Sequence, residues 1–161
     1  MGRVSFLSRI RLLVLHLRYK LGLLPVESKA GVISINSMYS LLWREFPKAN
    51  INVRRAWYRL CDDEMMVKFL ETDTNNLAKY DGYEGESYYT CVNYADGLQG
   101  EMARRLPEYA HGKLQTHGDP GHELNFYVNT EMNVKYVEPQ SDAVHDTLDN
   151  WQGEYVERAE A

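Results

Sequence analysis

The sequence contains very little cysteine. Only Cys61 and Cys91 occur among 161 residues, and they lack the CxxC spacing that marks thiolate zinc sites. Two cysteines are also too few for the disulfide framework of a small secreted domain. We therefore expect free thiols and a reducing compartment.

Long apolar runs and an excess of positive charge are also missing. Inside the apolar N-terminal segment the uncharged stretch 12–17 spans six residues, whereas a membrane span needs about 20. No uninterrupted apolar run with a small-residue cleavage site follows, so no signal peptide is predicted. The net charge of −5 argues against nucleic-acid binding over the surface as a whole.

The composition is nevertheless that of one folded domain with a core. Apolar residues make up 44% of the chain and aromatic residues 12%, and 161 residues is about the length of one domain. Residues 1–26 differ from the rest because they carry five basic residues and no acidic one. We predict a basic amphipathic helix for residues 1–26 and one α+β domain for residues 27–161.

The amphipathic helix has an apolar stripe at helical spacing. The stripe consists of Leu7, Ile10, Val14, Leu17, Leu21 and Leu24. Three interpretations stay open: packing on the same chain or a second copy, docking onto a larger protein assembly, or adsorption to an anionic membrane. Membrane contact is ranked last, because Leu12 and Leu15 interrupt the polar face.

Cys91 is the first candidate for chemistry. Ala95, Leu98 and Met102 follow it at helical spacing, which predicts a central helix that begins at Cys91. Free N–H groups and the dipole in a first helical turn favour a thiolate, and the Cys91 N–H would stabilise an oxyanion beside the sulfur. The competing interpretation is an inert core thiol, because cysteine is among the most buried residue types.

His122 and Glu138 are the second and third candidates. His122 precedes an alternating run, residues 124–128, and Glu138 ends a second such run before Pro139. Alternation predicts strands, and a hairpin of the two would bring His122 beside Glu138. A carboxylate there would orient the imidazole, as the third group of a catalytic triad does.

Two further expectations concern metal and the end of the chain. His117, His122 and Glu138 offer ligand types that zinc accepts, but a loop separates the two histidines, so we predict no metal and no cofactor. Residues 141–161 are acidic and carry apolar residues at helical spacing, which predicts an acidic C-terminal helix. Those apolar residues are Val144, Leu148, Trp151 and Tyr155.

Short sequence motifs around the candidate residues resemble those of a known protein family, and the similarity extends over about residues 55–145. The motifs are similar to those of small papain-like cysteine proteases of phages and bacteria, and to those of the C-terminal cysteine-protease domain of a mushroom agglutinin. The residues that carry the resemblance are Cys91, Tyr94, Ala95, Gly121, His122, Asn125, Glu138, Gln140 and Asp142. Val92 and Asn93 depart from the family, which often has two acids there, and Glu123 replaces a small residue.

The resemblance implies a papain-like α+β fold, in which the central helix packs on a small antiparallel sheet. It implies that Cys91 is the nucleophile, His122 the base and Glu138 the group that orients the base. Gln140, Tyr89 or a residue upstream would complete the oxyanion hole.

The expected activity is that of a cysteine peptidase or amidase acting on a peptide or cell-wall amide. The alternative is a noncatalytic assembly protein of a virion, docked through residues 1–26. The phage resemblance implies a bacterial host cytoplasm, with incorporation into a virion left open.

Overall fold

The structure is a computed structural model that describes residues 28–77, 87–118, 121–148 and 155–161. The predicted helix of residues 1–26 lies outside the described residues, as does the side chain of Tyr89. Within the described residues, no helix is long and apolar enough to cross a membrane.

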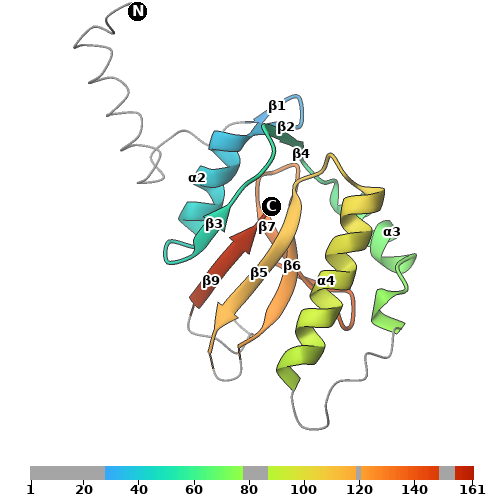
Figure 1. Ribbon diagram of the computed structural model, residues 1–161. Helices are drawn as coiled ribbons and strands as arrows, with labels where there is room; N and C mark the ends of the chain where they lie inside the picture. Colours follow the sequence, from blue (N-terminus) through green and yellow to red (C-terminus); the bar gives the residue numbers. More distant parts are fainter. Residues whose placement is uncertain (1–27, 78–86, 119–120, 149–154) are drawn as a thin grey trace, which may run out of the picture.

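The described part is built from helices and short strands (Figure 1). The helices are α2 (Ile35–Glu45), α3 (Asp63–Glu71), the 3-10 helix η1 (Asn75–Leu77) and α4 (Ser87–Arg105). The strands are β1 (Ser28–Lys29), β2 (Val32–Ser34), β3 (Asn50–Asn52), β4 (Trp57–Arg59), β5 (His111–His117), β6 (Glu123–Val128), β7 (Val134–Glu138), β8 (Ala143–His145) and β9 (Tyr155–Glu160).

The strands of the described residues form two sheets. The larger sheet has the order β3-β9-β5-β6-β7-β8 and the smaller one β1-β2-β4. Neighbouring strands are antiparallel except β3 and β9, which are parallel. Helices beside a mostly antiparallel sheet make an α+β fold, so the α+β part of the predicted fold class is confirmed.

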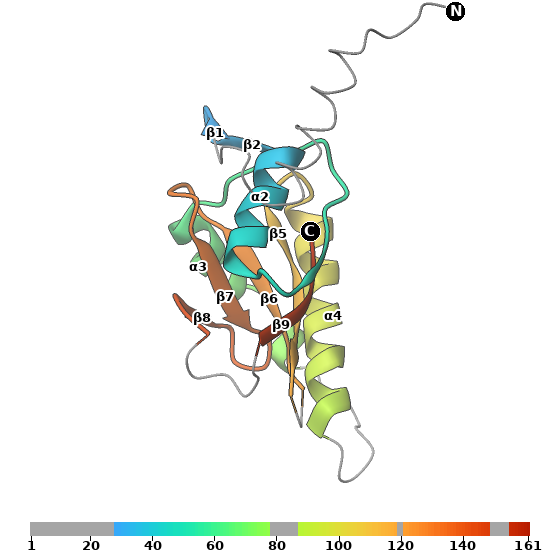
Figure 2. The same ribbon diagram turned by 90° about the vertical axis from the view of Figure 1, so that its left-hand side faces the viewer.

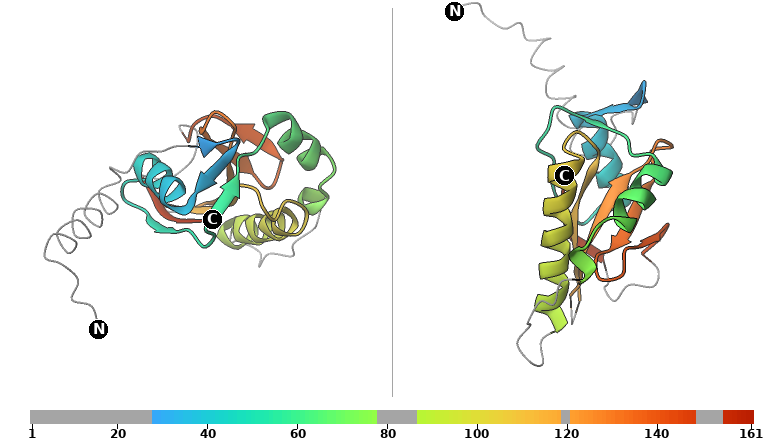
Figure 3. Two further views of the ribbon diagram at one scale, coloured as in Figure 1. Left: turned by 90° about the horizontal axis from the view of Figure 1, so that it is seen from above. Right: turned by 90° about the vertical axis from the view of Figure 1, so that its right-hand side faces the viewer.

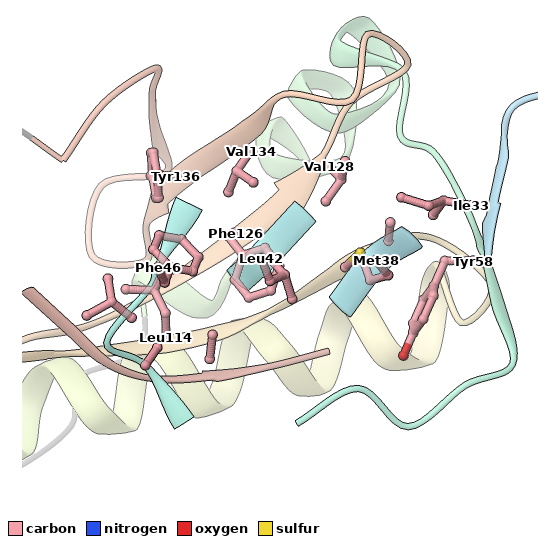
Figure 4. Close-up of a cluster of buried hydrophobic side chains, with 14 of the residues drawn as sticks. Ile33, Met38, Leu42, Phe46, Tyr58, Leu114, Phe126, Val128, Val134 and Tyr136 are labelled. Carbon is pink, nitrogen blue, oxygen red and sulfur yellow. The ribbon is translucent and has the colours of Figure 1, made fainter. Parts of the chain in front are cut away.

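The two faces of the larger sheet are covered by different helices. Successive side chains of a strand point to opposite faces, and every residue of β6 is buried. Phe126 packs in a core with Met38 and Leu42 of α2, which Figure 4 shows in close-up. Tyr127 packs in a second core with Leu98 of α4. Figures 2 and 3 show α2 and α4 on either side of the sheet.

Local signals explain where the helices begin. Asp62 caps α3, because its Oδ1 accepts a hydrogen bond from the Met65 N–H at 3.0 Å and so satisfies one of the free donors of the first turn. Ser34 caps α2 in the same way through the N–H of Ser37. The acidic run after Cys61 is thus a helix start.

The predicted acidic C-terminal helix is wrong. Residues of that segment form β8 and β9 instead, and β9 lies between β3 and β5. Helical spacing of a few apolar residues is a weak signal, and tertiary pairing overrides it. The reason is hydrogen bonding: β5 and β3 would otherwise leave backbone N–H and C=O groups without partners in the sheet.

The fit of β9 against β5 is close at one position. A Cβ atom at Gly112 would meet the backbone oxygen of Glu160 and would lie 2.7 Å from the ring of Phe126. No side chain larger than hydrogen can occupy this position without moving β9 or the core. Gly112 therefore allows the close approach of β5 to its neighbours.

Candidate active site

The three predicted residues meet at one place in the structure. Cys91 comes from α4, His122 precedes β6 and Glu138 ends β7. The hairpin of β6 and β7 forms with the expected register, in which Val128 pairs with Val134. The side chains of Cys91 and His122 are hydrogen-bonded, and His122 Nε2 lies 2.8 Å from Glu138 Oε2.

Cys91 is not at the very start of its helix. α4 begins at Ser87, so Cys91 is the fifth helical residue, and a helical amide at this position bonds to the carbonyl four residues earlier. The dipole effect also falls off within the first turn. The prediction that the central helix begins at Cys91 is therefore wrong, and the Cys91 N–H is placed for a bond within the helix.

The thiol of Cys91 is buried, and yet its pKa is lowered. Cys91 is 3% exposed and lies on the sheet-facing stripe with Ala95 and Leu98. Burial raises its pKa, but hydrogen bonds from the side chain of His122 and the backbone N–H of Glu123, with the charge of His122, outweigh burial. The pKa of Cys91 therefore lies below its ordinary value of 9.0.

The imidazole of His122 shifts in the opposite direction. Burial lowers its pKa, but hydrogen bonds with Cys91 and Glu138 and the negative charges of both raise it to about 9. A lowered thiol pKa beside a raised imidazole pKa favours the thiolate–imidazolium pair over the neutral pair. This is the form of a cysteine nucleophile that attacks carbonyl carbon.

The Glu138 carboxylate is held at both oxygens. Oε2 contacts His122, and Oε1 accepts a hydrogen bond from the backbone N–H of Gln140 at 3.2 Å. Gln140 itself is exposed. The structure thus shows Gln140 fixing Glu138 through its backbone, a role that sequence reasoning missed because it looked for a side-chain donor.

The turn behind Glu138 closes tightly. The N–H groups of Ser141 and Asp142 both donate to the Glu138 carbonyl oxygen, at 3.2 and 2.8 Å, and Asp142 has a positive φ of 56°. Asn76 donates to the Asp142 carboxylate at 2.6 Å. Burial and the nearby charge of Asp73 raise the pKa of Asp142 to about 6. Asp142 therefore anchors the turn to η1.

A charged group next to the thiol was not expected from the sequence. Glu123 is 7% exposed, and its Oε2 lies 3.0 Å from Nζ of Lys113 on β5. The same Nζ lies 2.5 Å from Oδ1 of Asp96 on α4. The sequence carries no clear signal for this contact, because residues 111–117 show no regular alternation of apolar and polar residues.

The possible metal site does not form. Within the described residues, no group of three or more His, Cys, Asp or Glu side chains is arranged to hold a metal ion. His117 is exposed, with Nδ1 3.7 Å from the carboxylate of Glu157, whereas His122 contacts Glu138. The two histidines therefore serve different neighbours.

The comparisons with known proteins bear on the fold. No family model matches the sequence, and no curated protein matches it. The structure is similar to the PSL1a–E64 complex, with a TM-score of 0.65 and 10% identity over 81% of this chain and 50% of that chain. It is also similar to Polyporus squamosus lectin bound to a human-type influenza-binding epitope, with a TM-score of 0.59 and 12% identity over 76% and 46%.

These matches correct the expected family. The chain spans about half the length of the similar structures, and likeness at this identity shows the fold alone. The identification with small phage and bacterial papain-like cysteine proteases is wrong, because no protease family matches and the structures found are lectins. The α+β class stands, while its papain-like detail gains no support.

Proposed function

We propose that the protein is a cysteine hydrolase that cleaves an amide bond through Cys91, His122 and Glu138. The observation that supports this proposal is the chain of contacts from thiol to imidazole to carboxylate. Glu138 occupies Nε2 of His122, which leaves Nδ1 for the sulfur. The opposite pKa shifts of the thiol and the imidazole are those that a nucleophile and its base require.

In the proposed reaction the Cys91 thiolate attacks the amide carbonyl carbon, and the carbonyl π electrons move to oxygen. His122 then donates its proton to the amide nitrogen, the C–N bond breaks, and a thioester remains on the sulfur. His122 next accepts a proton from water, whose oxygen attacks the thioester carbon. The C–S bond then breaks, the sulfur leaves as the thiolate, and the product is released as a carboxylic acid. Glu138 keeps the ring oriented and stabilises its charged form.

The oxyanion needs donors other than the Cys91 amide. Tyr89 and Gln140 remain our proposed donors, because each is two residues from a member of the triad. The substrate class that we propose is a peptide or a cell-wall amide.

Covalent labelling tests the assignment of the nucleophile. One similar structure is a complex with E64, an epoxide that alkylates activated thiols, so E64 and the smaller iodoacetamide are suitable probes. At pH 7 we expect both to modify Cys91 and not Cys61, and we expect Cys91→Ser to lose labelling while Cys61→Ser keeps it. A Cys91 that reacts no faster than Cys61 would overturn the proposal.

The burial of the thiol supports a second candidate function. Cys91 is only 3% exposed, which is typical of a structural core residue. The alternative is a noncatalytic assembly protein that docks onto a larger complex through residues 1–26. This alternative predicts an unreactive Cys91 and loss of a binding partner on deletion of residues 1–26, so the labelling experiment separates the two candidates.

A further inference from the structure

Glu123 presents the proposed nucleophile with two opposed influences. Its backbone N–H donates to the Cys91 sulfur and favours the thiolate, whereas its carboxylate charge repels the thiolate and raises the thiol pKa. The Glu123 side chain is 10% exposed, so solvent cannot screen its charge as it screens a surface charge. A chain that keeps an acid here needs a cation to offset it.

Lys113 supplies that cation. Its Nζ lies 3.0 Å from Glu123 Oε2, and that oxygen has no hydrogen-bond donor in good geometry. The charge of Lys113 is therefore what compensates it. Lys113 also contacts Asp96 of α4 at 2.5 Å, so the ammonium connects the strand to the helix that carries Cys91.

We propose that Lys113 is a positioning residue of the site: it offsets the buried Glu123 carboxylate, so that Cys91 forms its thiolate and the Glu123 amide stays directed at the sulfur. The inference rests on the proposed function for its purpose, although the ionisation of Cys91 can be measured without any substrate. Within the part of the chain that the structure describes, the charged groups that face the sulfur are His122 and Glu123. Glu138 lies behind His122, and Lys113 and Asp96 lie behind Glu123.

The test is the pH profile of Cys91 alkylation by iodoacetamide in full-length variants, followed on the Cys91 peptide by mass spectrometry. Lys113→Met removes the charge and keeps the aliphatic length. We expect the midpoint of its Cys91 alkylation profile to move up by about one pH unit, so that the rate at a pH below both midpoints falls about tenfold. Lys113→Arg should stay within about threefold of the parent, because it keeps the charge.

The decisive variant is the double replacement. In Lys113→Met with Glu123→Gln the repelling carboxylate is gone as well, so the rate should return to within about twofold of the parent. A double variant as slow as Lys113→Met would show that the lysine acts through packing and would overturn the proposal. An unchanged rate in Lys113→Met would overturn it too.

Lys135→Met is the matched control. Lys135 is buried to a similar degree as Lys113, and its Nζ lies 2.5 Å from Asp146 on the β7–β8 side of the sheet. The replacement of Lys135 should leave the pH profile of Cys91 alkylation unchanged. If circular dichroism shows that Lys113→Met does not fold, the single variant Glu123→Gln tests the proposal instead. Loss of the acid should hold or raise the Cys91 rate, and a fall of more than about threefold would overturn the proposal.

The two proposals fail in different ways. An unreactive Cys91 in the parent protein would sink the hydrolase proposal, while the Lys113 effect would still show as a further rise of the thiol pKa. A Cys91 that is reactive in the parent protein and reacts at the same rate in Lys113→Met would overturn only the inference about Lys113.

Discussion

A cysteine and a histidine lie near each end of helix α4, and the pKa values of the two pairs are shifted in opposite directions. Cys91 and His122 lie toward its beginning. Cys61 and His111 lie toward its end, where His111 contacts the carbonyl oxygen of Leu106 at 3.0 Å. All four residues are largely buried, so burial alone does not decide which thiol is a nucleophile.

The second pair, Cys61 and His111, shows how burial shifts the pKa values of a thiol and an imidazole without a contact like that of His122 with Glu138. Burial and the charge of Asp63 raise the pKa of Cys61 to about 12, and its Sγ lies 3.6 Å from the Ala110 carbonyl oxygen. Burial and the charge of Arg55 lower the pKa of His111 to about 4. Both groups are therefore neutral at pH 7. At the other end, mutual hydrogen bonding and Glu138 shift both pKa values toward the charged forms.

The strongest way to break this contrast is His122→Ala. Without the imidazole, burial acts on Cys91 as it does on Cys61, and the thiol pKa should rise above 9. The rate of alkylation at pH 7 should fall about a hundredfold, since only the thiolate reacts. His117→Ala is the control, because His117 is exposed, and it should change nothing. A fall of less than about threefold in His122→Ala would contradict the assignment.

The stability of the protein should separate the two histidines by pH. His111 has a folded pKa near 4 against 6.5 unfolded, so the unfolded state binds the extra proton. Its contribution is present above pH 6.5 and is lost as pH falls through 4, at a cost of about 2 kcal/mol between pH 7 and pH 5. Urea unfolding should show this acid slope in the parent and not in His111→Gln.

His122 should show the opposite slope. Its folded pKa of about 9 lies above the unfolded value of 6.5, so its contribution is present below pH 6.5 and is lost as pH rises through 9. His122→Gln should flatten the alkaline arm of the stability profile between these values. An alkaline arm that is the same in both proteins would contradict the raised pKa.

Glu138→Gln should have a smaller effect than His122→Ala. It tests whether the charge of Glu138 causes the difference between the two cysteine–histidine pairs. The amide oxygen can still accept from Nε2 and hold the ring, but it no longer stabilises the imidazolium. We expect the His122 pKa to fall, the Cys91 pKa to rise, and alkylation at pH 7 to slow about tenfold. Glu157→Gln is the matched control, because Glu157 contacts the exposed His117 instead. Equal rates in the two variants would argue against a role for Glu138.

The smallest effect should come from Cys61→Ala. This replacement removes a fully buried sulfur, and we expect the free energy of unfolding to fall by about 1 kcal/mol. Alkylation of Cys91 should stay within about twofold of the parent. A large loss of Cys91 reactivity would show that the two ends of α4 are coupled, which the contacts do not indicate.

Local pattern predicted part of this arrangement and missed the rest for physical reasons. The β6–β7 hairpin is a local structure, which the alternation of apolar and polar residues and a short turn predict. This prediction correctly placed His122 beside Glu138. The contact of Lys113 with Glu123 depends on the pairing of β5 with β6, and that of Lys113 with Asp96 on the packing of α4. The β9 segment has a helical spacing of apolar residues, and only its neighbours in the sheet make it a strand.

The place of β9 has a consequence for how the chain folds during synthesis. β3 pairs with β9 across more than a hundred residues, as in the pair Asn50 and Arg158, and β5 pairs with β9 on its other side. The ribosome must therefore release nearly the whole domain before β3 can join the large sheet. Until then the edge of β5 is open, so the nascent chain depends on α4 and the β6–β7 hairpin to stay compact.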